Sequence, residues 1–147
     1  MFGWITSVML RRSIRHMNDG DIGPTLGSYS DNAVVIFPGD HSWGGEYRGK
    51  QRIEGFLRRL VDTGMKFEVE DIVVHGWPWR FTVCVRLTDS ARDADGNVVY
   101  SNRAVIFAKS AWGKIYYHEA YEDTQKVVEF DRYLQQTEPV AIGEPLA

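Results

Sequence analysis

Four long segments in the second half of the chain alternate apolar with polar residues, and this alternation constrains the fold more than any other feature. The segments cover residues 66–76, 79–89, 98–110 and 114–122. In the second segment every other residue from Phe81 to Leu87 is apolar, as expected for a strand with one buried face. Residues typical of turns separate the segments. Short connections between consecutive long strands predict an antiparallel meander.

The first half of the chain has helical periodicity instead. Residues 4–17 predict a helix, and a short second helix is expected after Asp21, with Pro24 in its first turn. A turn at residues 30–32 and a strand at residues 33–37 follow. The clearest helix covers residues 50–61, where apolar side chains recur on one face, and a last helix is expected over residues 125–135.

Helices placed before a single antiparallel sheet define an α+β domain. A long, twisted sheet curls, and helices on its concave side leave a cone-shaped cavity between the two layers. We therefore expect a cone-shaped barrel, in which a curved antiparallel sheet wraps around the N-terminal helices. The expected boundaries are a single domain over residues 1–136 and a flexible tail over residues 137–147, which contains two prolines and a glycine.

Composition excludes several classes of function. A net charge of −3 with the two signs interspersed argues against nucleic acid as a partner, and no apolar run is long enough to cross a bilayer. The single cysteine, Cys84, excludes an internal disulfide. The first ten residues lack the basic flank and the cleavage site of a signal peptide. We therefore expect a cytoplasmic protein with no membrane partner.

One glycine-rich connection, residues 37–49, concentrates polar and aromatic side chains between a predicted strand and a predicted helix. It contains Asp40, His41, Trp43 and Tyr47. Groups able to move protons, set beside large aromatic rings, suit the mouth of a small-molecule pocket. An aspartate after Pro-Gly is also typical of a turn, in which its carboxylate accepts local backbone N–H groups and the histidine faces water. The sequence leaves both interpretations open.

Short motifs with a characteristic order and spacing extend over residues 5–135. They are Asn18-Asp19-Gly20-Asp21, Ser30-Asp31-Asn32-Ala33-Val34, Tyr47-Arg48-Gly49-Lys50 followed by Ile53, Trp112-Gly113-Lys114-Ile115 and Tyr121-Glu122-Asp123-Thr124. In these motifs the chain resembles the nuclear transport factor 2-like (cystatin-like) superfamily, and within it the SnoaL-like relatives of polyketide cyclases. The resemblance implies a mostly apolar, cone-shaped pocket and a homodimer formed through the sheet.

The resemblance implies no single activity, because such relatives include ketosteroid isomerases, epoxide hydrolases and non-enzymatic association modules. Phe37 occupies the position of the aspartate that acts as the general base in the isomerases, and Ser13 that of their tyrosine donor. Arg103 matches the arginine of the epoxide hydrolases, but no aspartate lies two residues away, and Ala120 falls at the position of their final acid. Neither mechanism is therefore expected here.

The other candidate residues lie on the last two predicted strands. His118 and Glu122 share one face of the segment 114–122, and the small Ala120 between them favours this face as the pocket wall. Asn102 and Arg103 are neighbours on a strand, so they point to opposite faces. We predict four catalytic residues: Asp40 and His118 as acid or base, His41 and Asn102 as polarising groups. The predicted substrate-binding residues are Phe37, Trp43, Tyr47, Arg103 and Glu122.

The histidines do not predict a metal site, because His41, His75 and His118 lack the spacing of metal-binding motifs. Neither a phosphate-binding glycine loop nor a nucleophilic serine motif is present, so no cofactor is expected. The sequence thus favours a cofactor-free isomerase, cyclase, dehydratase or hydrolase that acts by acid–base chemistry on a small lipophilic ligand, a cyclic carbonyl or hydroxyl compound. The alternative is a non-catalytic ligand-binding or protein-association module of the same fold.

Overall fold

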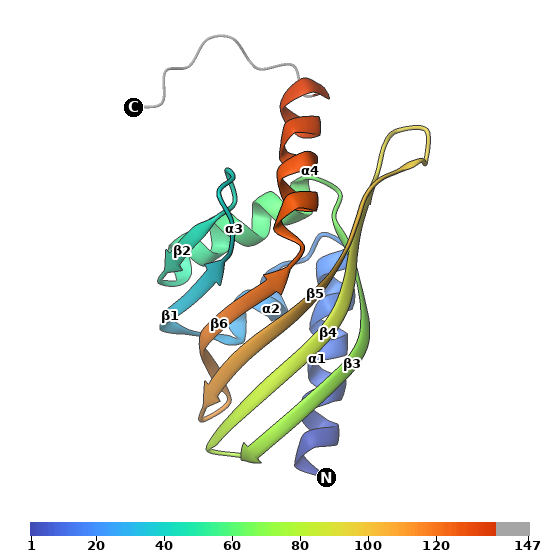
Figure 1. Cartoon of the computed structure of the whole chain (residues 1–147). Coiled ribbons are helices and arrows are strands. Elements are labelled where there is room, and N and C mark those ends of the chain that lie inside the picture. Colours follow the sequence, from blue (N-terminus) through green and yellow to red (C-terminus); the bar gives the residue numbers. More distant parts are fainter. Residues whose placement is uncertain (138–147) are drawn as a thin grey trace.

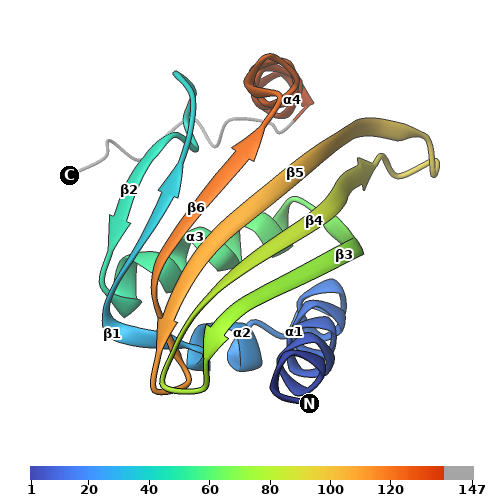
Figure 2. The same ribbon diagram turned by 60° about the horizontal axis from the view of Figure 1, so that its bottom comes forward.

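The computed structural model describes residues 1–137, which form four helices and six strands. In chain order these are α1 (Phe2–Asn18), α2 (Gly23–Gly27), β1 (Tyr29–Phe37), β2 (Gly45–Arg48), α3 (Lys50–Asp62), β3 (Lys66–Trp77), β4 (Arg80–Arg92), β5 (Val98–Ala111), β6 (Lys114–Glu122) and α4 (Thr124–Thr137). The strands make one sheet in the order β2-β1-β6-β5-β4-β3. Helices α1, α2 and α3 lie against one face of the curled sheet, and α4 stands at one end of it (Figures 1 and 2). Apart from Thr137, the tail expected over residues 137–147 lies outside the described residues.

The α+β class and the antiparallel meander are both confirmed. Strands β3, β4, β5 and β6 pair antiparallel in chain order. On β4 the predicted apolar face is the buried one, with Val83, Val85 and Leu87 almost fully covered. This face is concave and turned toward the helices, so every second residue of the long strands points into the space between the layers.

Three details differ from the expected fold. Strand β1 runs parallel to β6, so the sheet is mixed; no hairpin joins the two strands, and their relative direction is therefore not restricted to antiparallel. Residues 30–32 are extended within β1 rather than forming a turn, and the β1–β6 pairing is irregular between Tyr29 and Val34. The connection 37–49 contains the edge strand β2, whose four residues are too few to show a period.

The helices α3 and α4 are close to their predicted ranges, and the expected end signals explain why. Gly64, just after α3, has a φ of 76°, which glycine adopts without steric cost. The Asp123 carboxylate accepts a hydrogen bond from the backbone N–H of Gln125 at 3.1 Å and so caps α4. The buried residues of α3 are the predicted stripe of Ile53, Phe56, Leu57 and Leu60.

The core consists of three apolar clusters arranged around the space between the sheet and the helices. One of them closes the end of this space beneath α4, where the rings of Phe130 and Tyr100 stack with centroids 4.5 Å apart. The structure therefore has a closed end at α4. Among the helices of residues 1–137, none combines the length and the apolar character needed to cross a membrane.

Candidate functional site

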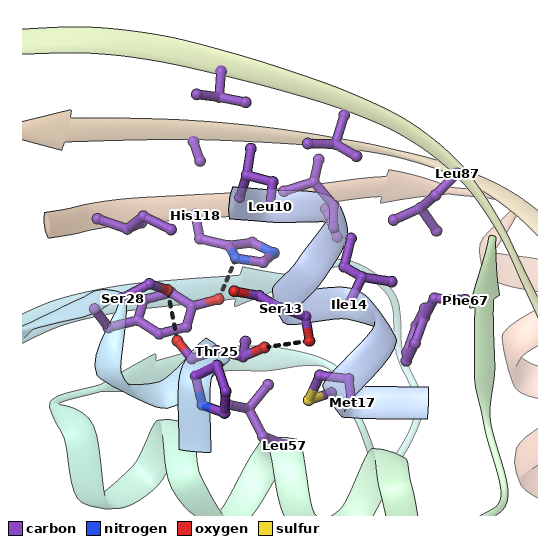
Figure 3. Close-up of a pocket in the computed structure, with 18 of the residues that line it drawn as sticks. Leu10, Ser13, Ile14, Met17, Thr25, Ser28, Leu57, Phe67, Leu87 and His118 are labelled. Carbon is purple, nitrogen blue, oxygen red and sulfur yellow. Dashed lines mark hydrogen bonds between the residues drawn. The ribbon is translucent and has the colours of Figure 1, made fainter. Parts of the chain in front are cut away.

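A cavity of about 710 Å³ lies between the concave face of the sheet and helices α1, α2 and α3. This volume is within the range of small-molecule sites. Figure 3 shows side chains from the helices, including Leu10, Ile14, Met17 and Leu57, facing Leu87 and His118 from the sheet. Most of the lining is apolar, so the few polar groups on the wall determine what chemistry the cavity can perform.

The first polar group is a pair formed by His118 of β6 and Tyr29 of β1. A hydrogen bond of 2.6 Å joins the Tyr29 hydroxyl to Nδ1 of His118 (Figure 3). Burial lowers the pKa of His118 to about 4 and raises the pKa of Tyr29. The imidazole is therefore neutral at physiological pH. A neutral imidazole with one nitrogen engaged can offer its other nitrogen to a ligand.

The second polar group lies toward the closed end and consists of Asp89, Tyr100 and Glu122. The Tyr100 hydroxyl donates to Oδ2 of Asp89 at 3.1 Å, and Nδ2 of Asn102 donates to the Tyr100 oxygen at 3.1 Å. Within residues 1–137, Oδ1 of Asp89 and Oε1 of Glu122 are buried and have no hydrogen-bond partner. Both carboxyl groups line the cavity. We call Asp89 and Glu122 the acid pair.

Burial dominates the electrostatics of the acid pair. It raises the pKa of Glu122 to about 8, with the nearby Asp89 and Asp123 carboxylates raising it further. Burial also raises the pKa of Asp89, although its hydrogen bond from Tyr100 acts in the opposite direction. At neutral pH Glu122 is therefore mostly protonated. Two neighbouring carboxyl groups whose pKa values are raised by burial in one apolar site are candidates for general acid–base catalysis.

Comparison with known proteins identifies the family. The sequence profile of the SnoaL-like domain matches residues 10–118. The chain belongs to the SnoaL-like family. No curated protein shows significant sequence similarity to it.

Solved structures with the same SnoaL-like fold are distant in sequence. Bal32a, from a soil-derived mobile gene cassette, has a TM-score of 0.71 at 19% identity, covering 88% of this chain and 98% of its own. A nuclear transport factor 2-like protein of unknown function from Burkholderia pseudomallei has a TM-score of 0.71 at 16% identity, covering 85% and 95%. TerC, co-crystallised with polyporic acid, has a TM-score of 0.67 at 21% identity, covering 84% and 95%. At such identities the likeness shows the fold alone.

In this SnoaL-like domain Asp40 and His41 do not lie where the sequence analysis placed them. Asp40 is exposed, and neither residue lines the cavity. The His41 ring is held by its own loop, with Nε2 2.8 Å from the Pro38 carbonyl oxygen and Nδ1 accepting the Trp43 N–H at 3.2 Å. The connection therefore forms a turn, but the local hydrogen bonds recorded in it are those of the His41 ring, which does not face water as expected.

The aromatic residues of the connection have different positions. Phe37 and Trp43 line the SnoaL-like cavity, and Trp43 is buried with the Arg59 guanidinium 4.0 Å above its ring. Tyr47 does not line the cavity; its hydroxyl donates to the Trp43 carbonyl at 2.7 Å, and its ring packs on Phe56. Tyr47 therefore holds the connection in place rather than forming the pocket wall.

The candidate residues on β5 and β6 lie on two different faces of the sheet. His118 and Glu122 line the cavity with Ala120, which confirms this face of β6 as the pocket wall. Arg103 is exposed on the opposite face of the sheet, so its predicted contact with substrate is wrong. Asn102 is buried on the inner face but lies behind Tyr100, and Nδ2 also donates to the Asp123 carbonyl at 2.9 Å. Asn102 supports the acid pair through Tyr100 instead of touching the cavity.

Asp89, Tyr100 and Tyr29 line the cavity and were missed from the sequence. One signal was present for Asp89. It occupies the next position of the apolar face after Leu87, where a carboxylate interrupts an otherwise apolar alternation. An acid on the buried face of a strand is costly unless it is neutral or paired, and it therefore marks a candidate site. Among residues 1–137 no group of three or more His, Cys, Asp or Glu is placed to hold a metal ion.

Proposed function

We propose that this SnoaL-like protein binds a lipophilic cyclic carbonyl or hydroxyl compound and changes it by acid–base chemistry that uses only the chain's own side chains. The observation that carries the proposal is the acid pair: two buried carboxyl groups that line the cavity, each with one oxygen that has no hydrogen-bond partner within residues 1–137. Isomerisation, cyclisation, dehydration and hydrolysis all need a proton removed at one atom and supplied at another.

In this proposal Asp89 is the base and Glu122 is the acid. In the proposed reaction the Asp89 carboxylate removes a proton next to the carbonyl through Oδ1, and its raised pKa makes it a stronger base than an exposed aspartate. Glu122, protonated, donates to the carbonyl oxygen as the enol forms. One proton enters the protein at Asp89 and one leaves at Glu122, so the total number of protons on the pair is unchanged.

Tyr100 and the His118–Tyr29 pair have supporting roles in this proposal. The Tyr100 hydroxyl occupies Oδ2 of Asp89 and thereby leaves Oδ1 as the reactive oxygen. His118 lies four residues before Glu122 on the same face of β6. At about 3.3 Å per residue the two lie roughly 13 Å apart along the strand. A ligand with a second oxygen at that distance would contact both polar groups.

The test is the exchange of carbon-bound hydrogen in a bound ketone. The probe is 2-tetralone, a small bicyclic ketone, incubated with the protein in deuterium oxide and followed by proton NMR. We expect the protein to accelerate exchange next to the carbonyl over buffer. Asp89→Asn and Glu122→Gln should each lower the acceleration by about 10²- to 10⁴-fold, the usual contribution of a positioned acid or base. Arg103→Ala, on the opposite face of the sheet, is the control and should leave exchange unchanged.

Binding is measured separately, so that catalysis and ligand capture are distinguished. Polyporic acid, the compound co-crystallised with TerC, serves with 2-tetralone as a binding probe in a thermal-shift assay. Probe binding without any acceleration of exchange would overturn the catalytic proposal and favour the alternative, a ligand-binding module. Two observations favour that alternative. The cavity wall is mostly apolar, and Nδ1 of His118 is already hydrogen-bonded to Tyr29.

A further inference from the structure

Four of the five tryptophans of this chain are exposed, although tryptophan is usually well buried. The exposed fractions are 70% for Trp4, 67% for Trp77, 52% for Trp79 and 82% for Trp112. Only Trp43 is covered. These side chains do not pack in the core of the domain, so their exposure on the surface needs another explanation.

The exposed tryptophans gather at one end of the molecule. Trp4 is in the first turn of α1, Trp77 is the last residue of β3, Trp79 is in the β3–β4 turn, and Trp112 is in the β5–β6 turn. Figures 1 and 2 show the start of α1 and both turns at the end of the sheet opposite α4. The Trp112 N–H donates to the Trp79 carbonyl at 3.1 Å, so the two turns are in direct contact.

The same end is the mouth of the cavity. The cavity-lining residues at the α4 end, such as Val127 and Phe130, are buried, whereas Met9, Pro78 and Gly113 are exposed and also line the cavity. The mouth thus opens between α1 and the two turns. We call Trp4, Trp77, Trp79 and Trp112, together with the exposed Ile5, Val8 and Met9 of α1, the aromatic rim.

The backbone at Trp112 gives independent evidence that its exposure is not incidental. Trp112 and Gly113 form a two-residue turn, with φ values of 52° and 76°. Asparagine or glycine suits the first of these positions, and a bulky residue there is strained. A tryptophan in a strained conformation, with most of its surface in water, is explained by a contact made outside the domain.

The charges around the aromatic rim are all of one sign. Residues 1–18, 76–80 and 111–114 contain no aspartate or glutamate, in a chain whose net charge is −3. Of the basic residues in these ranges, Arg80 and Lys114 adjoin the two turns, whereas Arg11, Arg12 and Arg15 lie further along α1, which runs away from this end (Figure 1). The mouth is therefore a basic and aromatic end on an otherwise acidic protein, which matches an anionic surface.

We propose that the aromatic rim docks on an anionic lipid surface and that the cavity takes up its lipophilic ligand directly from that surface. Tryptophan is the side chain that prefers the boundary between lipid headgroups and acyl chains, and arginine beside it pairs with anionic headgroups. Docking in this orientation places the cavity mouth against the lipid. The protein lies on the surface without spanning it, in agreement with the absence of a membrane-spanning helix among the described residues.

The test is sedimentation with vesicles of phosphatidylcholine alone and of phosphatidylcholine mixed with phosphatidylglycerol. We expect binding to the mixed vesicles that weakens at high salt, and a blue shift of tryptophan emission, because four of the five indoles are at the rim. Trp77→Ala and Trp112→Asn should each weaken partitioning roughly tenfold, the effect of losing one partly inserted indole. Asparagine suits the positive φ of residue 112, so the turn is kept. Arg80→Ser with Lys114→Ser, the two basic residues that adjoin the turns, should remove the preference for the mixed vesicles.

Val98→Ala is the control, because Val98 is an exposed apolar residue at the start of β5, at the end of the strand away from the β5–β6 turn; its vesicle binding should equal that of the unaltered chain. Failure to bind mixed vesicles would overturn the proposal, and so would binding that the two tryptophan variants leave intact. A change of oligomeric mass in the rim variants would show that a second copy covers the rim, which also overturns it. None of these measurements uses catalysis, so their failure is distinct from failure of the acid–base proposal.

Discussion

Glu122 links the charge of the cavity wall to the stability of the fold. Burial keeps this carboxyl protonated in the folded protein up to a pH of about 8, whereas in the unfolded chain it ionises near pH 4.3. Between these values the folded state binds more protons than the unfolded state, so stability falls as pH rises. We expect the free energy of unfolding to drop between pH 6.5 and 8 by at most about 1.4 kcal/mol per pH unit, as measured by urea unfolding.

Glu122→Gln should remove most of this pH dependence, because the amide cannot ionise; the exposed Glu68→Gln is the control and should keep it. The pH range of the measurement starts at 6.5 because below this pH the titration of His118 changes the free energy of unfolding in the opposite direction. Its lowered pKa of about 4 means that the unfolded chain gains a proton first as pH falls, and stability is lost toward acid. A free energy of unfolding that stays constant between pH 6.5 and 8 in the unaltered protein would contradict the raised pKa of Glu122.

At the scale of elements, one loop is tied to two helices, to α4 by Asp131 and to α3 by Arg59. Asp131 of α4 accepts hydrogen bonds from the Ser42 N–H at 3.0 Å and the Ser42 hydroxyl at 2.6 Å. Arg59 of α3 donates to the Ser42 carbonyl at 2.9 Å. Together these bonds fix the loop between β1 and β2 on the outside of the domain, with Trp43 beneath it.

Asp131→Ala should release this loop. We expect a loss of about 2 kcal/mol of stability, because the Ser42 N–H and the Arg59 guanidinium lose a charged partner. Amide hydrogen exchange should accelerate across residues 38–44 and stay unchanged in β4 and β5. Glu129→Ala, an exposed acid on the same helix, should do neither. Slow exchange in the loop of the Asp131 variant would show that other contacts hold it.

How far the sequence predicts each element depends on how regular its environment is. The strands β3 to β6 and the helix α3 each repeat one buried face over several periods, so pattern alone located them. Strand β2 has four residues on a sheet edge and no repeat. Asp40 and His41 were misplaced because a Pro-Gly turn can face either way, and only the contact between Ser42 and Asp131, far apart in the chain, fixes its direction. Asp89 could be predicted as a site residue only by knowing that its face of the strand forms the cavity wall.

At the scale of the whole molecule, the convex face of the sheet is free for a second copy. Val73, Val105 and Tyr121 are exposed on this face, and Val105 and Tyr121 are direct neighbours across β5 and β6. An exposed apolar patch on one face of a sheet is typical of an interface. We expect the protein to be a homodimer through this face, with about twice the 16.8 kDa chain mass in light scattering after size exclusion.

Val105→Arg should yield the single-chain mass without unfolding the domain, since residue 105 points away from the core. Trp112→Asn lies at the cavity mouth, away from the convex face. This variant should leave the dimer intact and is the control for Val105→Arg. A single-chain mass for the unaltered protein would contradict the interface, and a loss of dimer only in the Trp112 variant would move the interface to the aromatic rim.

The pairing of β1 with β6 has a consequence for the order in which the molecule is made. Tyr29 and His118, which meet across this pairing, are 89 residues apart in the chain. Contacts so distant in sequence form late in folding, because the intervening chain must first be ordered. During synthesis on the ribosome, α1, α3 and the first strands therefore emerge before β6. Their apolar faces stay exposed until β6 has been made. The ligand cavity is completed only when β6 and α4 have both been made, so a chain that stops before β6 lacks the wall that carries His118 and Glu122 as well as the closed end at α4.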